Sequence, residues 1–307
     1  MAPHRPYLAS PAATPVAAHA DARPTDGAAT RGTAAVDGVT LARRHDPGER
    51  RPFLLVHGLA SSARLWDVVA DRLAAAGHEV LAVDLRGHGR SPDPGVGHDT
   101  PTAAADLAAL LAAEGLVGGR APVVAGQSWG GNVVVELAAR HGGPAAIVLV
   151  DGGWIHLAAA YRDVEACWAD LAPPRLGDRS LEELAAGLRA SRPGWPEASL
   201  AALLTCYVER DGRAFPRLDR GAHRSILDSL YAIDPATRFG AVEVPALLLV
   251  AGAEAAAPPP AVARAIDGLP EASVSWYPDG DHDLHAEQPD AVAADLLSLA
   301  ARLEEGR

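Results

Sequence analysis

Short, uninterrupted apolar runs alternate along the chain with segments in which apolar residues recur every three or four positions. The runs occupy residues 53–56, 80–83, 122–125, 147–150 and 246–251, and a further strand is expected over residues 273–277. A continuous apolar run is typical of a strand that is buried on both faces of a parallel sheet. Because helices are expected between most of these strands, the pattern predicts an α/β fold built on a doubly wound, mostly parallel sheet.

The segments between the runs have helical spacing, and a turn signal precedes the first run. Helices are predicted over residues 65–76, 100–114, 129–141, 260–266 and 289–303. Near the start of the chain, the turn-favouring pair Asp37-Gly38 lies between residues 33–36 and 39–43. This arrangement predicts that a hairpin opens the fold.

The alternation stops after the sixth predicted strand, between residues 154 and 244. Proline and glycine separate helical patches there, at residues 157–171, 181–190, 200–209 and 223–230, without a buried-strand pattern. We therefore expect a helical cap inserted into the sheet domain. The expected organisation is a flexible tail at 1–32, a core at 33–153 and 245–307, and a cap at 154–244.

Composition and charge disfavour several classes of partner. Apolar residues make up 49% of the chain, enough for a sizeable core, and the net charge is −12. This charge repels phosphate backbones and anionic lipids, so we expect a small-molecule substrate and neither a nucleic-acid nor a membrane partner. No apolar stretch approaches the ~20 residues of a membrane span. The first residues lack the apolar segment of a secretory signal, so the expected location is cytoplasmic.

The residue types available also limit the chemistry. All 27 basic residues are arginines, which removes Schiff-base catalysis and a P-loop lysine. Cys167 and Cys206 have no metal-binding spacing, and we expect free thiols. Neither a metal nor an organic cofactor is expected.

Residues 126–130 read Gly-Gln-Ser-Trp-Gly and match the nucleophile-elbow motif G-x-S-x-G. The motif alone is weak evidence, because a chain with 30 glycines can produce it by chance. Its context is favourable, since an apolar strand precedes it and a helical pattern follows. A serine on such a strand-to-helix turn has a strained backbone, and Cβ atoms beside it would collide, which explains the glycines. Ser128 is therefore the predicted nucleophile.

At these residues the chain resembles the α/β-hydrolase superfamily, over roughly residues 33–305. The resemblance is carried, in this order, by His57-Gly58, by residues 84–91 (DLRGHGRS), by residues 126–131 (GQSWGG) and by residues 280–282 (GDH). It implies that a histidine after the last strand is the base, which is His282, five residues beyond Tyr277. His285 is a local rival that we expect on the far side of a turn.

The resemblance also implies an oxyanion hole and a third catalytic residue. The expected oxyanion donors are the backbone N–H groups of Leu59 and Trp129. In the common pattern the acid ends a G-x-x-D turn after the strand that finishes at residue 251, but that position holds Ala255. Asp151, at the tip of the strand before the cap, is the preferred acid. Glu254, one residue early in the turn, is the alternative.

A serine at position 128 argues against the aspartate-nucleophile branches of the superfamily. It leaves hydrolysis of esters, thioesters, lactones or amides through an acyl-enzyme, carbon–carbon cleavage of diketones, and acyl transfer. We expect a carboxylic ester hydrolase for an apolar substrate of small to medium size, because the cap contributes three Trp and three Tyr that could wall a pocket. The empty acid position keeps a non-catalytic ligand-binding or scaffold protein as the alternative.

Overall fold

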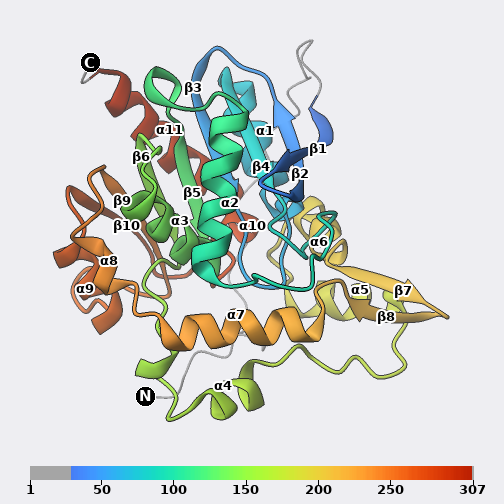
Figure 1. The fold of residues 1–307 in the computed structure, drawn as a ribbon. Coiled ribbons are helices and arrows are strands. Elements are labelled where there is room, and N and C mark those ends of the chain that lie inside the picture. The colour runs from blue at the N-terminus through green and yellow to red at the C-terminus, as the bar shows by residue number, and fades with distance from the viewer. Residues whose placement is uncertain (1–28, 306–307) are drawn as a thin grey trace.

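A computed structural model describes residues 29–305, and an eight-stranded sheet forms its centre (Figure 1). The strands lie in the order β1-β2-β4-β3-β5-β6-β9-β10. Pairing is antiparallel between β1, β2 and β4, and parallel through the rest of the sheet. The bounds are β1 (Thr30–Val36), β2 (Val39–Asp46), β3 (Arg50–Val56), β4 (His78–Val83), β5 (Val123–Gln127), β6 (Ala146–Val150), β9 (Ala246–Ala251) and β10 (Ala272–Tyr277). The predicted doubly wound, mostly parallel sheet is confirmed.

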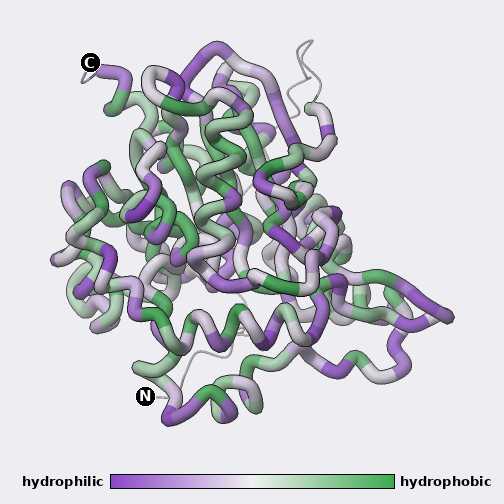
Figure 2. The backbone as a smooth tube through the Cα atoms, in the orientation of Figure 1, coloured by the Kyte–Doolittle hydropathy of each residue, from purple (hydrophilic) through white to green (hydrophobic). Residues whose placement is uncertain are grey.

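Helices cover both faces of the sheet, which explains the continuous apolar runs. The side chains of Phe53 and Leu55 join the core that packs on α1 (Asp67–Ala75) and α11 (Pro289–Glu305). Leu54 and Val56, between them in the sequence, join the opposite core, which packs on α2 (Thr100–Ala113), α3 (Trp129–Arg140) and α9 (Pro260–Gly268). Burial of a side chain of this size stabilises the folded state by about 1.5–3 kcal/mol relative to leaving it exposed. Hydrophobic residues gather in these central strands (Figure 2).

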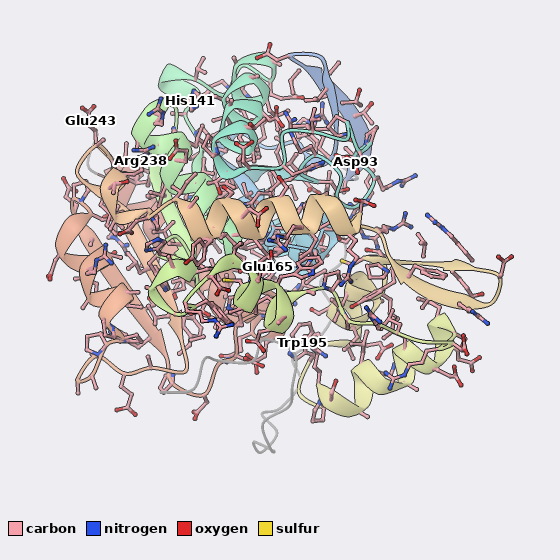
Figure 3. The ribbon with its side chains drawn as sticks, turned by 60° about the horizontal axis from the view of Figure 1, so that its bottom comes forward. Asp93, His141, Glu165, Trp195, Arg238 and Glu243 are labelled. Atoms are coloured by element: carbon pink, nitrogen blue, oxygen red, sulfur yellow. The ribbon has the colours of Figure 1, made fainter. Side chains whose placement is uncertain are left out.

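The chain between β6 and β9 forms a cap that contains a hairpin as well as helices. Its elements are η3 (Leu157–Ala159), α4 (Val164–Leu171), α5 (Leu181–Ser191), α6 (Glu197–Leu204), β7 (Tyr207–Arg210), β8 (Arg213–Pro216), α7 (Arg220–Ala232) and α8 (Ala236–Phe239). Helix α7 is held to α4 by Arg224, whose guanidinium pairs with Glu165 at 2.6 Å. Figure 3 labels Glu165 and a second cap residue, Trp195.

The prediction of an all-helical cap is wrong at residues 205–216. The predicted patch 200–209 ends as a helix at Leu204, and β7 pairs antiparallel with β8. The turn is Asp211-Gly212, with φ values of 50° and 73°, and it repeats the Asp37-Gly38 pair of the first hairpin. The hairpin projects from the cap with a hydrophilic tip (Figures 1 and 2).

The start of the chain and three short elements complete the description of the fold. Residues 1–28 of the expected tail lie outside the described residues, and Thr30–Gly32 belong to β1, so the predicted tail boundary at 32 is too late. The remaining elements are η1 (Ala63–Trp66), η2 (Gly118–Arg120) and α10 (Leu284–Glu287). Within residues 29–305, no helix combines the length and the apolarity that a membrane span requires.

Candidate active site

Ser128 lies on the sharp turn between β5 and α3. Its φ of 53° and ψ of −124° are unusual for a residue with a side chain. A Cβ at Gly126 would overlap the carbonyl group of Gly130, and a Cβ at Gly130 would overlap the backbone of His57. Glycine is therefore required on both sides of Ser128. The backbone N–H of Ser128 donates to the carbonyl oxygen of Val150 at 3.0 Å, which ties the turn to β6.

Asp151 follows β6 and lies beside the elbow because the two strands pair in register. Gln127 and Val150, their last residues, are partners across the pair. Gly152 has no room for a Cβ, which would overlap the backbone of Ser128. Nδ1 of His282 donates to Oδ2 of Asp151 at 2.6 Å, and Oδ1 of Asp151 accepts the N–H of Ala251 at 3.3 Å. The carboxylate is thus fixed on both oxygens, one of them by the histidine.

The negative charge around His282 controls its pKa. Burial alone would lower this pKa, but the hydrogen bond and charge of Asp151, with smaller effects from Asp283 and Asp281, raise it to about 9. The side chain of His282 is 32% exposed, so it is accessible to solvent. An imidazole held by a carboxylate on Nδ1 presents Nε2 as its second nitrogen, the arrangement of a general base.

The structure leaves the two rival residues apart from this pair. Glu254 is exposed in the loop after β9, and its carboxylate accepts no hydrogen bond from the described residues. His285 is completely buried on α10, with its ring 4.4 Å from that of Trp66. Burial, with the charges of His282 and His57, lowers the pKa of His285 to about 3. His285 therefore belongs to the core.

Two backbone N–H groups near Ser128 have no acceptor among residues 29–305. They belong to Trp129, the first residue of α3, and to Leu59, in the loop after β3. Helix N-termini leave such donors free. The indole of Trp129 is fully buried and donates to Oγ1 of Thr100 at 3.0 Å, so packing explains this side chain.

Histidines and an aspartate from two motifs shape the loop that carries Leu59. Nε2 of His88 accepts the N–H of Ala60 at 3.3 Å, and Ala60 has a φ of 59°. His57 accepts the N–H of Leu85 at 3.0 Å. Oδ1 of Asp84 accepts the N–H of Ala63 at 2.8 Å. Burial lowers the pKa of both histidines, so each ring is neutral and can accept.

Two polar side chains at the elbow were not singled out from the sequence. Asn132, in the first turns of α3, accepts the N–H of Gly153 at 3.0 Å and donates to the carbonyl oxygen of Ile155 at 2.7 Å. It fixes the start of the cap to the elbow helix. Gln127, the residue before Ser128, is 1% exposed and bonds to the segment that carries His282. The only sequence signal for Gln127 was an amide side chain inside the motif.

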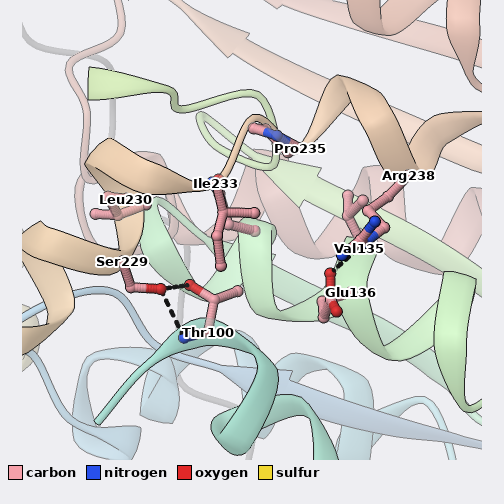
Figure 4. Close-up of a pocket in the computed structure, with 9 residues that line it drawn as sticks. Thr100, Val135, Glu136, Ser229, Leu230, Ile233, Pro235 and Arg238 are labelled. Carbon is pink, nitrogen blue, oxygen red and sulfur yellow. Dashed lines mark hydrogen bonds and ion pairs between the residues drawn. The ribbon is translucent and has the colours of Figure 1, made fainter. Parts of the chain in front are cut away.

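A small cavity lies between α3, α7 and α8 (Figure 4), and neither His282 nor Asp151 lines it. It is lined by Thr100, Asn132, Glu136, Ser229 and Arg238, among others, and its volume is about 10 Å³. This volume is about that of one water molecule, too small for a substrate. Nor do the described residues include a group of three His, Cys, Asp or Glu side chains arranged to hold a metal ion.

Comparison with known proteins identifies the family of this chain. The model of the alpha/beta hydrolase family matches residues 53–295. The chain belongs to this family. The resemblance drawn from the motifs is therefore confirmed, as is the fold that it implies.

Individual relatives differ in how much of their length the chain matches. It is 44% identical over 97 residues to a non-heme haloperoxidase of Rhodococcus erythropolis, which is 32% of this chain and 34% of that protein. The match thus spans about a third of this relative. Similarity to an N-formylmaleamate deformylase of Pseudomonas putida extends over 245 residues at 29% identity, 76% of this chain and 83% of that enzyme.

Among solved structures, the fold is similar to that of E-2-(acetamidomethylene)succinate hydrolase. The TM-score is 0.73 at 22% identity, over 88% of this chain and 98% of that one. At this identity the similarity concerns the fold.

Proposed function

We propose that this protein is a serine hydrolase that cleaves a small to medium apolar carboxylic ester through an acyl-enzyme at Ser128. The observation that carries the proposal is the 2.6 Å hydrogen bond between His282 and Asp151, beside a serine whose φ is 53°. A strained serine, a histidine and a carboxylate that orients the histidine are the three groups that this chemistry needs.

In the proposed reaction, Nε2 of His282 accepts the proton of the Ser128 hydroxyl while Oγ attacks the ester carbonyl carbon. The resulting tetrahedral intermediate collapses when His282 returns that proton to the leaving alkoxide, which departs as an alcohol. Water then gives a proton to His282 and attacks the acyl carbon, and release of the acid restores the Ser128 hydroxyl. Asp151 stabilises the imidazolium that forms in both halves.

The N–H groups of Leu59 and Trp129 are the proposed oxyanion donors. Both lack an acceptor among the described residues, so neither must break a protein hydrogen bond in order to bind the developing charge. A preorganised donor of this kind contributes about 2.7–4 kcal/mol to transition-state binding.

Amide hydrolysis is the second candidate, and one observation favours it. The deformylase of Pseudomonas putida aligns with 76% of the chain, and its name describes removal of a formyl group that is bound through nitrogen. The same three residues would serve, because His282 can protonate an amine leaving group in place of an alkoxide. The alternative of a non-catalytic ligand-binding protein rested on Ala255, which stands where the common pattern has an acid. That argument is weakened, because Asp151 supplies a carboxylate to His282 from another strand.

Hydrolysis of p-nitrophenyl acetate and butyrate, and of a matched N-formyl amide, tests the proposal in wild type and Ser128→Ala. We expect serine-dependent turnover with a burst of p-nitrophenol, and labelling of the wild type but not of the variant by a fluorophosphonate probe. Turnover that persists in Ser128→Ala, or the absence of both turnover and labelling across acyl lengths, would contradict it. The ratio of ester to amide rates then decides between the two candidates.

A further inference from the structure

We propose that Gln127 is a positioning residue that holds the backbone of His282 at a fixed place relative to Ser128. The inference rests on the proposed function, because it assigns a role in the same reaction. Gln127 is the last residue of β5 and the neighbour of Ser128 in the chain. Its side chain is 1% exposed, so its amide must find its hydrogen-bond partners inside the protein.

Both N–H bonds of this amide are directed at the segment that carries the base. Nε2 of Gln127 donates to the carbonyl oxygen of His282 at 3.1 Å and to Oδ1 of Asp283 at 3.3 Å. A primary amide has two N–H donors, so both are used. One side chain thus joins the strand of the nucleophile to two consecutive residues of the base segment.

The oxygen of the amide lies against the oxyanion segment. A Cβ at Gly58 would overlap Oε1 of Gln127 and would lie 3.0 Å from Cβ of Ser128. Glycine at position 58 therefore leaves room for the Gln127 amide directly beside the proposed oxyanion donor Leu59. The side chain contacts the elbow, the oxyanion segment and the base segment at once.

Few other bonds connect the base segment to the sheet. Within residues 279–283, the N–H of Gly280 bonds to Tyr277, that of Asp281 bonds to Glu287 at 2.7 Å, and that of His282 bonds to its neighbour Asp281. These bonds are local, as are those from the N–H groups of Ala286 and Glu287 to the carbonyl oxygen of Asp283. Apart from them, the described residues tie the segment to the core through the bond from His282 to Asp151 and the two bonds from Gln127.

The two ties have different consequences. Asp151 holds the imidazole ring and sets its charge, whereas Gln127 holds the main chain from which that ring extends. Loss of the Gln127 donors leaves a carbonyl group and a carboxylate without partners, and the segment can shift. A displacement of about 1 Å in a reacting group can cost 10²-fold in rate.

Gln127→Met keeps the length of the side chain and removes both donors, and Gln127→Leu, also uncharged, removes them with a shorter side chain. The matched control is Glu136→Met, which removes a buried polar group of α3 that pairs with Arg238, outside the proposed machinery. We expect kcat on p-nitrophenyl butyrate to fall about 10²-fold in both Gln127 variants, with KM near the wild-type value, and to stay close to wild type in Glu136→Met.

An NMR measurement without substrate separates this proposal from the proposed function. The Nδ1 proton of His282 and the titration of its ring should both shift in Gln127→Met and not in Glu136→Met. If wild type shows no serine-dependent turnover, the proposed function fails, and the NMR comparison still decides the role of Gln127. An unchanged kcat with an unchanged His282 spectrum, or an equal effect of Glu136→Met, would overturn the inference. If Gln127→Met does not fold, Gln127→Leu, which is also uncharged and lacks both donors, carries the same test.

Discussion

The short hydrogen bond from His282 selects Asp151 among the carboxylates near the sheet edge, and Glu254 supplies an internal comparison. We expect Asp151→Asn to lower kcat by about 10⁴-fold, because an amide no longer fixes the tautomer or stabilises the imidazolium. Glu254→Gln should leave kcat at the wild-type level, since Glu254 is exposed and accepts no hydrogen bond from the described residues. Steady-state hydrolysis of p-nitrophenyl acetate measures both. A large loss in Glu254→Gln would contradict the proposed triad.

The charge of Asp151 also predicts a pH dependence for the reaction. The raised pKa of about 9 means that most of His282 is protonated at neutral pH, and a protonated imidazole cannot accept the Ser128 proton. The rate constant kcat/KM should therefore increase with pH, reach half of its maximum near pH 9 and level off above it. A profile that is already flat from pH 6 upward would show that the charge of Asp151 does not control the base.

At the scale of elements, the loop after β3 depends on a histidine from the loop after β4. His88→Leu removes the acceptor for the N–H of Ala60 and should let the segment of Leu59 relax, with a loss of up to about 10²-fold in kcat and little change in KM. His88→Gln keeps an acceptor and should recover part of the rate. His78→Leu is the control, because His78 is buried at the other end of β4 and bonds to the carbonyl oxygen of Arg51. Equal losses in His88→Leu and His78→Leu would indicate general destabilisation.

How far the sequence predicts each element depends on how its residues are buried. The central strands β3, β4, β5, β6 and β9 contain continuous apolar runs because both of their faces pack, and each of these strands was predicted. The hairpin β7–β8 packs little, and its Phe215 is 42% exposed, so hydrophobic pattern could not reveal it. Its Asp211-Gly212 pair was the available signal. The place of Gln127 depends on a contact with His282, 155 residues away, and no local pattern records such a distance.

The same limit applies to the third residue of the proposed triad. Spacing within the chain offered Asp151 and Glu254 as alternatives, and the choice rested on the resemblance to a family. The pairing of β5 with β6 in register supplies the physical reason, because it brings the end of β6 directly beside the elbow. Strand order is a property of the whole sheet, so it can be expected from the fold but not read from one segment.

For the molecule as a whole, buried neutral histidines set the response of the fold to acid. Burial is the main cause that lowers the pKa of five imidazoles, which are His57, His78, His88, His223 and His285. In the unfolded chain they titrate near 6.5. Below that pH these five residues bind more protons in the unfolded state than in the folded state, so their contribution to the free energy of unfolding falls as pH decreases, until each folded-state pKa is reached. Each histidine that remains neutral in the fold contributes about 1.4 kcal/mol per pH unit to this slope.

His285 allows that slope to be tested, because its folded-state pKa of about 3 keeps it neutral between pH 7 and pH 4. Neither of its ring nitrogens has a hydrogen-bond partner among the described residues. His285→Leu should lower the dependence of the unfolding free energy on pH by about one proton between pH 6 and pH 4. It should also stabilise the protein at pH 5, because leucine has no proton to exclude and no polar atom to desolvate. Urea unfolding of wild type and variant at pH 7, 6, 5 and 4 measures both effects. Parallel pH profiles for the two proteins would show that His285 is solvated or charged in the fold, in conflict with its burial against Trp66.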